Sequence, residues 1–319
     1  MKGKGGVFME KYDISAAAAG LIPKRPVCRY TYLSPTAWER EHFEVFLPRK
    51  VGYLAVRFMR CYSVECNHDI WRIVEMVAVD DMLEKRYELT TWGEFELAVR
   101  LVGRPDFSGG SNHGDEHTDV FSVSLDGVPT PLTALTELTP FERMTVLRDS
   151  RLYDPSAHDV MIATHHVNYK ITTEGVLIDQ DVMWAVDEAC TTSYMAMFPV
   201  LRKTEDRDGN TVHVSETYTD DVCNEVFDVR EEGLAEYPQR YKKGVRRMTL
   251  HSEELGVTAS LHILKLTDLP GGNYSQCSPK PAYNKLYDTI VGFGEGEGYR
   301  VSAGDLWEET TYFTLDIDK

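Results

Sequence analysis

The chain has 319 residues, of which 42% are hydrophobic and 27% charged, as expected for a globular protein with one large or two smaller domains. Its formal charge of −17 and pI near 5.0 exclude nucleic acid and anionic membrane surfaces as favourable partners, because like charges repel at long range. No apolar run approaches the roughly 20 residues that span a bilayer, and no signal peptide is apparent, so a cytoplasmic protein is expected.

In chain order, residues 1–25 are small, polar and aperiodic, which predicts an arm or a disordered tail. Residues 26–319 are expected to form one β-sandwich domain, with a possible soft subdivision near residues 126–150. Short helical turns are predicted at Pro35–Glu41 and Asp80–Lys85. The six cysteines are scattered and form no C-x-x-C pair, so a structural zinc cluster is not expected.

The rest of the chain is a succession of short segments that alternate in polarity or are rich in β-branched residues, separated by Gly and Pro. Strands are predicted at His42–Leu47, Val51–Cys61, Ile70–Val79, Trp92–Val102, His117–Leu125, Arg143–Leu147, Asp159–Ala163, His166–Thr172, Val176–Val186, Ser193–Leu201, Thr211–Tyr218, Cys223–Val229, Arg246–His251, Thr258–Leu266, Lys285–Phe293 and Glu308–Ile317. This pattern predicts an all-β fold, a large antiparallel β-sandwich of the jelly-roll or supersandwich type.

The most informative stretch is the polar loop at 106–119, which places two histidines and several carboxylates between a glycine-rich turn and a strand. His113, Asp115, His117 and Asp119 are candidate ligands for one divalent metal ion. Calcium would prefer oxygen ligands, including Asn112, whereas zinc or manganese would prefer the histidines. Strand parity puts His117 and Asp119 on the same face as Phe121, Val123 and Leu125, at the rim of the core.

Two later segments also carry polar groups in a pattern. In the strand after Thr164, apolar residues alternate with His166, Asn168 and Lys170, a face suited to hydroxyl-rich ligands or simply to water. Tyr194 and Arg202 are a candidate acid and a candidate charge neutraliser. Near the C-terminus, Asn284, Lys285 and Tyr287 are candidate ligand-binding residues.

These motifs on an all-β scaffold resemble carbohydrate-active β-sandwich proteins, in particular the jelly-roll and supersandwich polysaccharide lyases and their sugar-hydrolysing and sugar-binding relatives. The resemblance is diffuse and rests on His113–His117, Tyr283–Tyr287 and Gly304–Trp307. It implies an oligo- or polysaccharide partner. A homo-oligomer is compatible with the sequence.

By this resemblance, a lyase would use His117 or His166 as base, Tyr194 as acid, and Arg202 or Lys285 to neutralise a uronate. A hydrolase would need two carboxylates across the glycosidic bond. Adjacent Asp115 and Glu116 would point to opposite sides of an extended chain, so Glu116 or Asp119 would need a distant partner. Two alternatives stay open: a non-catalytic sugar-binding or assembly protein, and a metal-dependent cupin-like isomerase or oxygenase.

Overall fold

The computed structural model describes residues 11–93, 95–110, 112–223, 225–230, 244–269, 274–291 and 298–319. Almost all of their regular structure is strand, which confirms the predicted all-β sandwich-like fold. The strands are β1 (Val27–Tyr32), β2 (Glu39–Pro48), β3 (Tyr53–Ser63), β4 (His68–Val79), β5 (Lys85–Glu88), β6 (Glu96–Leu101), β7 (Glu116–Leu125), β8 (Val128–Thr130), β9 (Thr139–Pro140), β10 (Met144–Asp154), β11 (Ala157–Thr172), β12 (Gly175–Trp184), β13 (Glu188–Leu201), β14 (Lys203–Glu205), β15 (Thr211–His213), β16 (Thr217–Asp220), β17 (Phe227–Asp228), β18 (Arg247–Ser252), β19 (Val257–Leu266), β20 (Tyr274–Pro279), β21 (Tyr283–Thr289), β22 (Tyr299–Val301) and β23 (Leu306–Ile317). The helices are α1 (Ile14–Ala18) and the 3₁₀ turn η1 (Leu132–Ala134).

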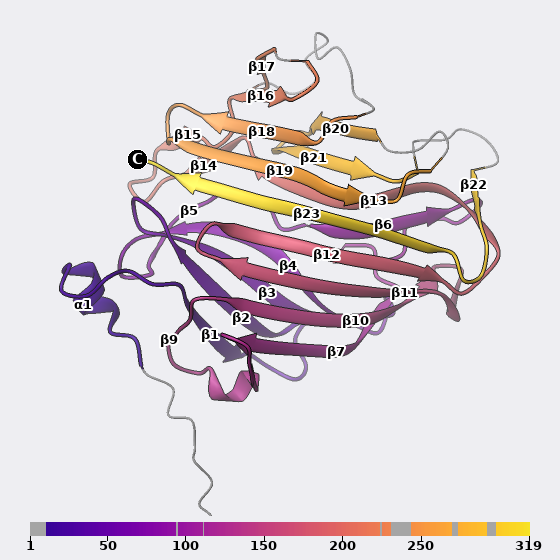
Figure 1. The fold of residues 1–319 in the computed structure, drawn as a ribbon, viewed down its shortest axis with the longest axis horizontal. Helices are drawn as coiled ribbons and strands as arrows, with labels where there is room; N and C mark the ends of the chain where they lie inside the picture. Colours follow the sequence, from indigo (N-terminus) through magenta and orange to yellow (C-terminus); the bar gives the residue numbers. More distant parts are fainter. Residues whose placement is uncertain are drawn as a thin grey trace, which may run out of the picture.

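A large curved sheet carries most of these strands, in the order β17-β16-β18-β19-β23-β12-β11-β10-β7-β4-β3-β2-β1-β9. The C-terminal strand β23 therefore lies between β19 and β12, near the middle of the sheet (Figure 1). Every pairing is antiparallel except that of β4 with β7, which is parallel over two residue pairs.

The smaller sheet has the order β20-β21-β13-β22, with β6 also paired to β13, and lies behind the large sheet in Figure 1. Its inward side chains pack on the large sheet, where Phe95 and Phe198 lie against Phe313. Such sheet-on-sheet packing buries the apolar face of each sheet, which is the main source of stability in a sandwich. A separate pair, β14 with β15, completes the described strands.

The strand predictions differ from the structure mainly at segment ends. Asp159–Ala163 and His166–Thr172 are parts of one continuous strand, β11, because Thr164 faces outward and His165 takes the next inward position, which keeps the alternation unbroken. Thr211–Tyr218 is divided between β15 and β16. Residues 292 and 293, the end of the last-but-one predicted strand, lie outside the described residues.

Neither predicted helical turn is a helix. The prediction of a helical turn at Pro35–Glu41 was wrong. The chain bends there and then enters β2 at Glu39. At Asp80–Lys85 the chain makes a tight turn, in which the Asp80 carboxylate accepts hydrogen bonds from the backbone N–H groups of Met82 and Glu84. The carboxylate thus satisfies donors in the way a helix cap does, without a helix following it.

Of the predicted N-terminal arm, residues 11–25 are described. They contain α1, whose N-cap Asp13 accepts a hydrogen bond from the Ala16 N–H. Tyr12 and Ile14 pack against a buried cluster that includes Phe46 and Tyr53. No helix within the described residues is long and apolar enough to cross a membrane.

Candidate functional site

The loop at 106–117 sends its polar side chains into three different environments. The His113 ring contacts Phe107 and lies 2.9 Å from the Asp106 carboxylate. Asp115 and His117 join a cluster at the surface, whereas Glu116 is fully buried. The polar groups that the sequence predicts in one site therefore lie in three separate environments.

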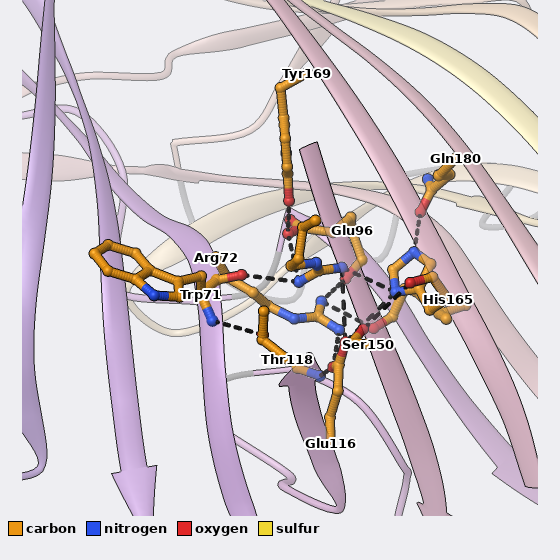
Figure 2. Close-up of polar contacts among 12 residues, drawn as sticks. Trp71, Arg72, Glu96, Glu116, Thr118, Ser150, His165, Tyr169 and Gln180 are labelled. Atoms are coloured by element: carbon orange, nitrogen blue, oxygen red, sulfur yellow. Dashed lines mark hydrogen bonds and ion pairs between the residues drawn. The ribbon is translucent and has the colours of Figure 1, made fainter. Parts of the chain in front are cut away.

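Glu116 is the centre of a buried ionic network (Figure 2). Its carboxylate accepts from Arg72 Nη2, from Ser150 Oγ at 2.6 Å and from the Gly110 N–H at 3.3 Å. Arg148 Nη2 lies 3.6 Å away and His165 Nδ1 lies 3.5 Å away. Because buried charges are costly unless paired, this many partners is what the position requires.

A second carboxylate, Glu96 of the smaller sheet, completes the network. Its Oε1 accepts from Arg148 Nη1 at 3.3 Å and from the Tyr169 hydroxyl. Arg72 reaches the same sheet by donating to the Glu96 and Leu97 carbonyl oxygens. The network therefore links the two sheets by charge-assisted bonds through their shared interior.

The network continues into a polar belt that crosses the large sheet and divides the core. Its residues are Arg148, Ser150, His165, Gln180, Glu309 and Thr311. On each strand the belt residues are flanked by one apolar cluster on one side and a second cluster on the other, as with Val146 and Leu152 on β10. His165 Nε2 lies 3.0 Å from Gln180 Oε1, and Gln180 Nε2 donates to the Met195 carbonyl at 2.8 Å.

The belt ends at a buried pair of carboxyl groups, Asp288 of β21 and Glu309 of β23, which interact electrostatically across the two sheets. Asp288 Oδ1 also accepts from Ser275 Oγ at 2.7 Å. Burial raises the pKa of Asp288 to about 7, and burial together with Asp288 raises the pKa of Glu309 well above its ordinary value. Burial and the repulsion between two neighbouring carboxylates both favour the protonated forms of this pair.

Burial and neighbouring charges together set the pKa values of the groups in the ionic network. Burial alone would raise the pKa of Glu116, but the guanidinium groups of Arg72 and Arg148 hold it well below the ordinary range. Burial and the charge of Arg148 lower the pKa of His165 to about 4. At neutral pH the network therefore holds an ionised Glu116 and a neutral His165.

A β-bulge explains why Glu116 is buried rather than His117. In the pairing with β10, Val120 is opposite Asp149 and Thr118 is opposite Ser150, so Asp119 is an extra residue. A bulge of one residue reverses the parity of all residues before it. The predicted placement of His117 and Asp119 at the rim of the core face was therefore wrong: Asp119 is exposed and pairs with Arg151.

At the surface, Asp115 contacts His158 directly and is linked to His117 through Asn67. The Asp115 carboxylate, 5% exposed, lies 2.5 Å from Nδ1 of His158, whose side chain is 56% exposed. Asn67 Nδ2 donates to Asp115 at 3.1 Å, and Asn67 Oδ1 lies 3.0 Å from His117 Nε2. We call Asn67, Asp115, His117 and His158 the rim cluster.

The backbone of the rim cluster is held in an uncommon conformation. Asn67 and Asp115 have φ values of 47° and 53°, in the left-handed region. The Asp115 N–H donates to the Cys66 carbonyl at 2.9 Å, and the Tyr153 N–H donates to the Asp115 carbonyl at 2.8 Å. Left-handed residues kept in place by their surroundings are frequent at functional sites.

One residue of the rim cluster, His117, also belongs to a lateral row of residues on adjacent strands. Tyr62 of β3 is opposite Asp69 of β4, which is opposite His117 of β7, which is opposite Arg151 of β10. Tyr62 is about 10 Å from His117, two strand spacings away. The Arg40 guanidinium lies over the Tyr62 ring.

The four predicted metal ligands have different partners. His113 bonds to Asp106, Asp115 to His158, His117 to Asn67, and Asp119 to Arg151. In the part of the chain that the structure describes, no three His, Cys, Asp or Glu side chains are placed to hold a metal ion. Asn112 is exposed in the same loop.

On β11, the predicted alternation is confirmed: Val167, Tyr169 and Ile171 are buried, and His166 and Lys170 are exposed. Asn168 is half-buried between them. His166 bonds to Asp149, and both side chains are about half exposed, at 46% and 48%. His166 is thus two strands from His117 on the large sheet and has a separate partner.

On the smaller sheet, three predicted residues do come together. The Tyr194 ring stacks between Phe107, at 5.5 Å, and Tyr287, at 4.6 Å, and Lys285 Nζ lies 5.0 Å from the Tyr287 ring centre. The faces of these rings are covered by one another, so the column is better suited to packing than to stacking against a ligand.

Two other predicted residues are buried. Asn284 is inaccessible, and its amide donates to Ser215 Oγ at 2.8 Å and to the Val229 carbonyl at 3.1 Å. Arg202 is 5% exposed and lies 3.5 Å from the Arg230 carbonyl. Their burial makes them poor candidates for direct contact with a ligand.

Sequence reasoning missed Asn67, Arg72, Arg148 and His158. Arg72 lies within a largely apolar strand, and Arg148 has the parity of the inward residues Met144 and Val146. A charged residue at a core position is a signal of a buried partner. Asn67 lies in a turn, where asparagine is common, and His158 is an exposed residue near the start of β11, so nothing in the sequence distinguishes them.

No family model matches the chain, and no curated protein matches it. Among solved structures, it is similar to a 4-alpha-glucanotransferase from Thermococcus litoralis, with 8% identity and a TM-score of 0.41 over 94% of this chain and 40% of that one. It is also similar to the Slr1438 protein from Synechocystis sp. PCC 6803, with 9% identity and a TM-score of 0.39 over 89% of this chain and 99% of that one. The chain thus spans less than half of the glucanotransferase, and at these TM-scores neither likeness supports an assignment of function.

Proposed function

We propose that this protein is a carbohydrate-active enzyme whose acid–base centre is the rim cluster. The observation that carries the proposal is the His158–Asp115 pair, a nearly buried carboxylate 2.5 Å from the Nδ1 of a half-exposed imidazole. A carboxylate in this position orients a histidine and stabilises its charged form, which is how histidine serves as a general base.

The reaction would use His158 Nε2 as the proton acceptor. Asp115 accepts the Nδ1 hydrogen, which leaves the Nε2 lone pair on the exposed side of the ring. In hydrolysis, an attacking water molecule would give its proton to Nε2 as its oxygen bonds to the anomeric carbon and the glycosidic C–O bond breaks. In elimination, the carbon next to a uronate carboxyl group would give its proton to Nε2, and the freed electron pair would form a C=C bond as the C–O bond breaks. In both reactions the imidazolium would give a proton to the leaving oxygen. His117, on the other side of Asn67, is the second candidate for proton transfer.

An oligo- or polysaccharide is the substrate class that the neighbouring surface favours. The lateral row through His117 presents a tyrosine ring, a carboxylate and a guanidinium on adjacent strands, with Tyr62, Asp69 and Arg151. Asp69 is bonded to Arg60 and Arg151 to Asp119, so a ligand would meet these groups as ion pairs. Hydrogen-bonding groups side by side on one face are suited to a ligand with many hydroxyl groups. Cleavage by hydrolysis or by elimination is equally compatible with a histidine base.

The test is a panel of neutral and uronate-containing glycans, assayed for new reducing ends and for the absorbance of an unsaturated product. We expect turnover of at least one glycan, and we expect His158→Gln to slow that turnover by roughly two to four orders of magnitude, the usual contribution of a general base. His166→Gln is the matched control, because His166 also pairs with an aspartate but one that is half exposed. Equal activity of the two variants would overturn the proposal, and binding without any product would favour a non-catalytic sugar-binding protein.

A further inference from the structure

Asn67 lies at the centre of the rim cluster, and its hydrogen bonds fix the orientation of its amide. Nδ2 is 3.1 Å from Asp115 Oδ1 and 2.8 Å from the His158 carbonyl oxygen. A carboxylate and a carbonyl oxygen can only accept hydrogen bonds, so the atom facing them must be the amide nitrogen. The amide oxygen is therefore the atom 3.0 Å from His117 Nε2.

This orientation determines which nitrogen of His117 carries the proton. An amide oxygen only accepts, so His117 Nε2 must donate to it. In the neutral ring the lone pair is then on Nδ1. By the same reasoning, Asp115 keeps the proton of His158 on Nδ1 and leaves Nε2 as its basic atom. The two histidines thus present different nitrogens for proton transfer.

We propose that Asn67 is a positioning residue that fixes the tautomer of His117 and links it to the Asp115–His158 pair. The catalytic consequence of this inference rests on the proposed function, but the tautomer does not. At a φ of 47°, the backbone alone would favour glycine at this position. The positioning role therefore requires the side chain of Asn67. Asparagine at this position therefore costs backbone energy relative to glycine and supplies three hydrogen bonds.

Asn67→Gly separates the side chain from the backbone conformation, since glycine accepts a positive φ without strain. Long-range ¹H–¹⁵N NMR of the full chain, at a pH where imidazole is neutral, reports the tautomer of each histidine. We expect His117 of the wild type to be protonated on Nε2, and Asn67→Gly to convert it to a mixture of tautomers. His166, which bonds to Asp149, is the internal control and should not change.

Asn67→Asp is the second variant. It separates the effect of the amide oxygen, which accepts from His117, from the effect of the amide nitrogen, which donates to Asp115 and to the His158 carbonyl. Aspartate keeps an acceptor for His117 Nε2 but removes the donors to Asp115 and the His158 carbonyl. We expect it to preserve the His117 tautomer. A wild-type His117 protonated on Nδ1, or an unchanged His117 spectrum in Asn67→Gly, would overturn the inference whatever the activity.

Activity then tests the positioning role. With a glycan that the wild type processes, we expect Asn67→Gly to slow turnover by tenfold or more and to change KM less. A shifted tautomer with an unchanged turnover rate would overturn the catalytic role of Asn67. If no glycan is processed, the proposed function fails, and the tautomer experiment still decides the structural role of Asn67.

Discussion

Replacing the buried carboxylate of Glu116 should destabilise the protein strongly. In Glu116→Gln, one amide oxygen can still accept from Ser150, but the amide nitrogen would face donors, namely Arg72 Nη2 and the Gly110 N–H. Arg148 would keep the Glu96 carboxylate, whereas Arg72 would keep only the carbonyl oxygens of Glu96 and Leu97 and lose its carboxylate partner. Removing one partner from a buried ion pair typically costs about 3–5 kcal/mol, because the other charge is left uncompensated.

Urea unfolding, followed by circular dichroism and tryptophan fluorescence, measures this loss as a lower midpoint at an unchanged slope. Asp119→Asn is the matched control from the same strand, because Asp119 pairs with Arg151 in a bridge that is 43% and 44% exposed. An exposed pair contributes about 0–1 kcal/mol, so this variant should unfold almost as the wild type does. A loss below about 1 kcal/mol for Glu116→Gln would refute the view that its charge holds the network together.

Two further variants test other parts of the interior. Because the folded pKa of Asp288 is raised to about 7 from an ordinary value near 4, its stabilising contribution is complete at low pH and is lost as the pH rises through about 7. Asp288→Asn should therefore show a smaller fall in unfolding free energy between pH 5 and pH 8 than the wild type, and an equal fall would contradict the raised pKa of Asp288. Gly114→Ala should lower stability by more than the roughly 1–2 kcal/mol of a left-handed alanine, because its φ is 86° and a Cβ would lie 2.2 Å from the Cys66 carbonyl oxygen. Gly127→Ala is its control, since Gly127 has a φ of 82° and open space around it, and thermal melts showing equal losses would refute the steric argument.

The sequence predicts the fold class well, because alternation of apolar and polar residues is a local property of each strand. On β11 the alternation of Val167 and Tyr169 with His166 and Lys170 is correct residue by residue. Strand order is not local, and nothing in the sequence indicates that β23 would lie between β12 and β19.

The candidate site was predicted only in part. The sequence singles out the loop at 106–117, but the bulge at Asp119 reverses which residues face inward, and a bulge leaves no clear mark on the sequence. Asp115 bonds to Asn67 and His158, and His117 bonds to Asn67. Asn67 and His158 are close to this loop only in the folded chain. A sequence can therefore nominate the chemical groups of a site, whereas their pairing follows from the register of strands far apart in the chain.

The most direct test of the proposed function is to locate the bound ligand. We would map amide and imidazole chemical-shift changes by NMR while adding a glycan oligomer that the protein binds. We expect the largest changes at His117 and His158 of the rim cluster and at Tyr62 of the lateral row through His117. Changes confined to the aromatic column around Tyr194, with the rim cluster unaffected, would contradict the proposal that His158 and Asp115 form the acid–base centre.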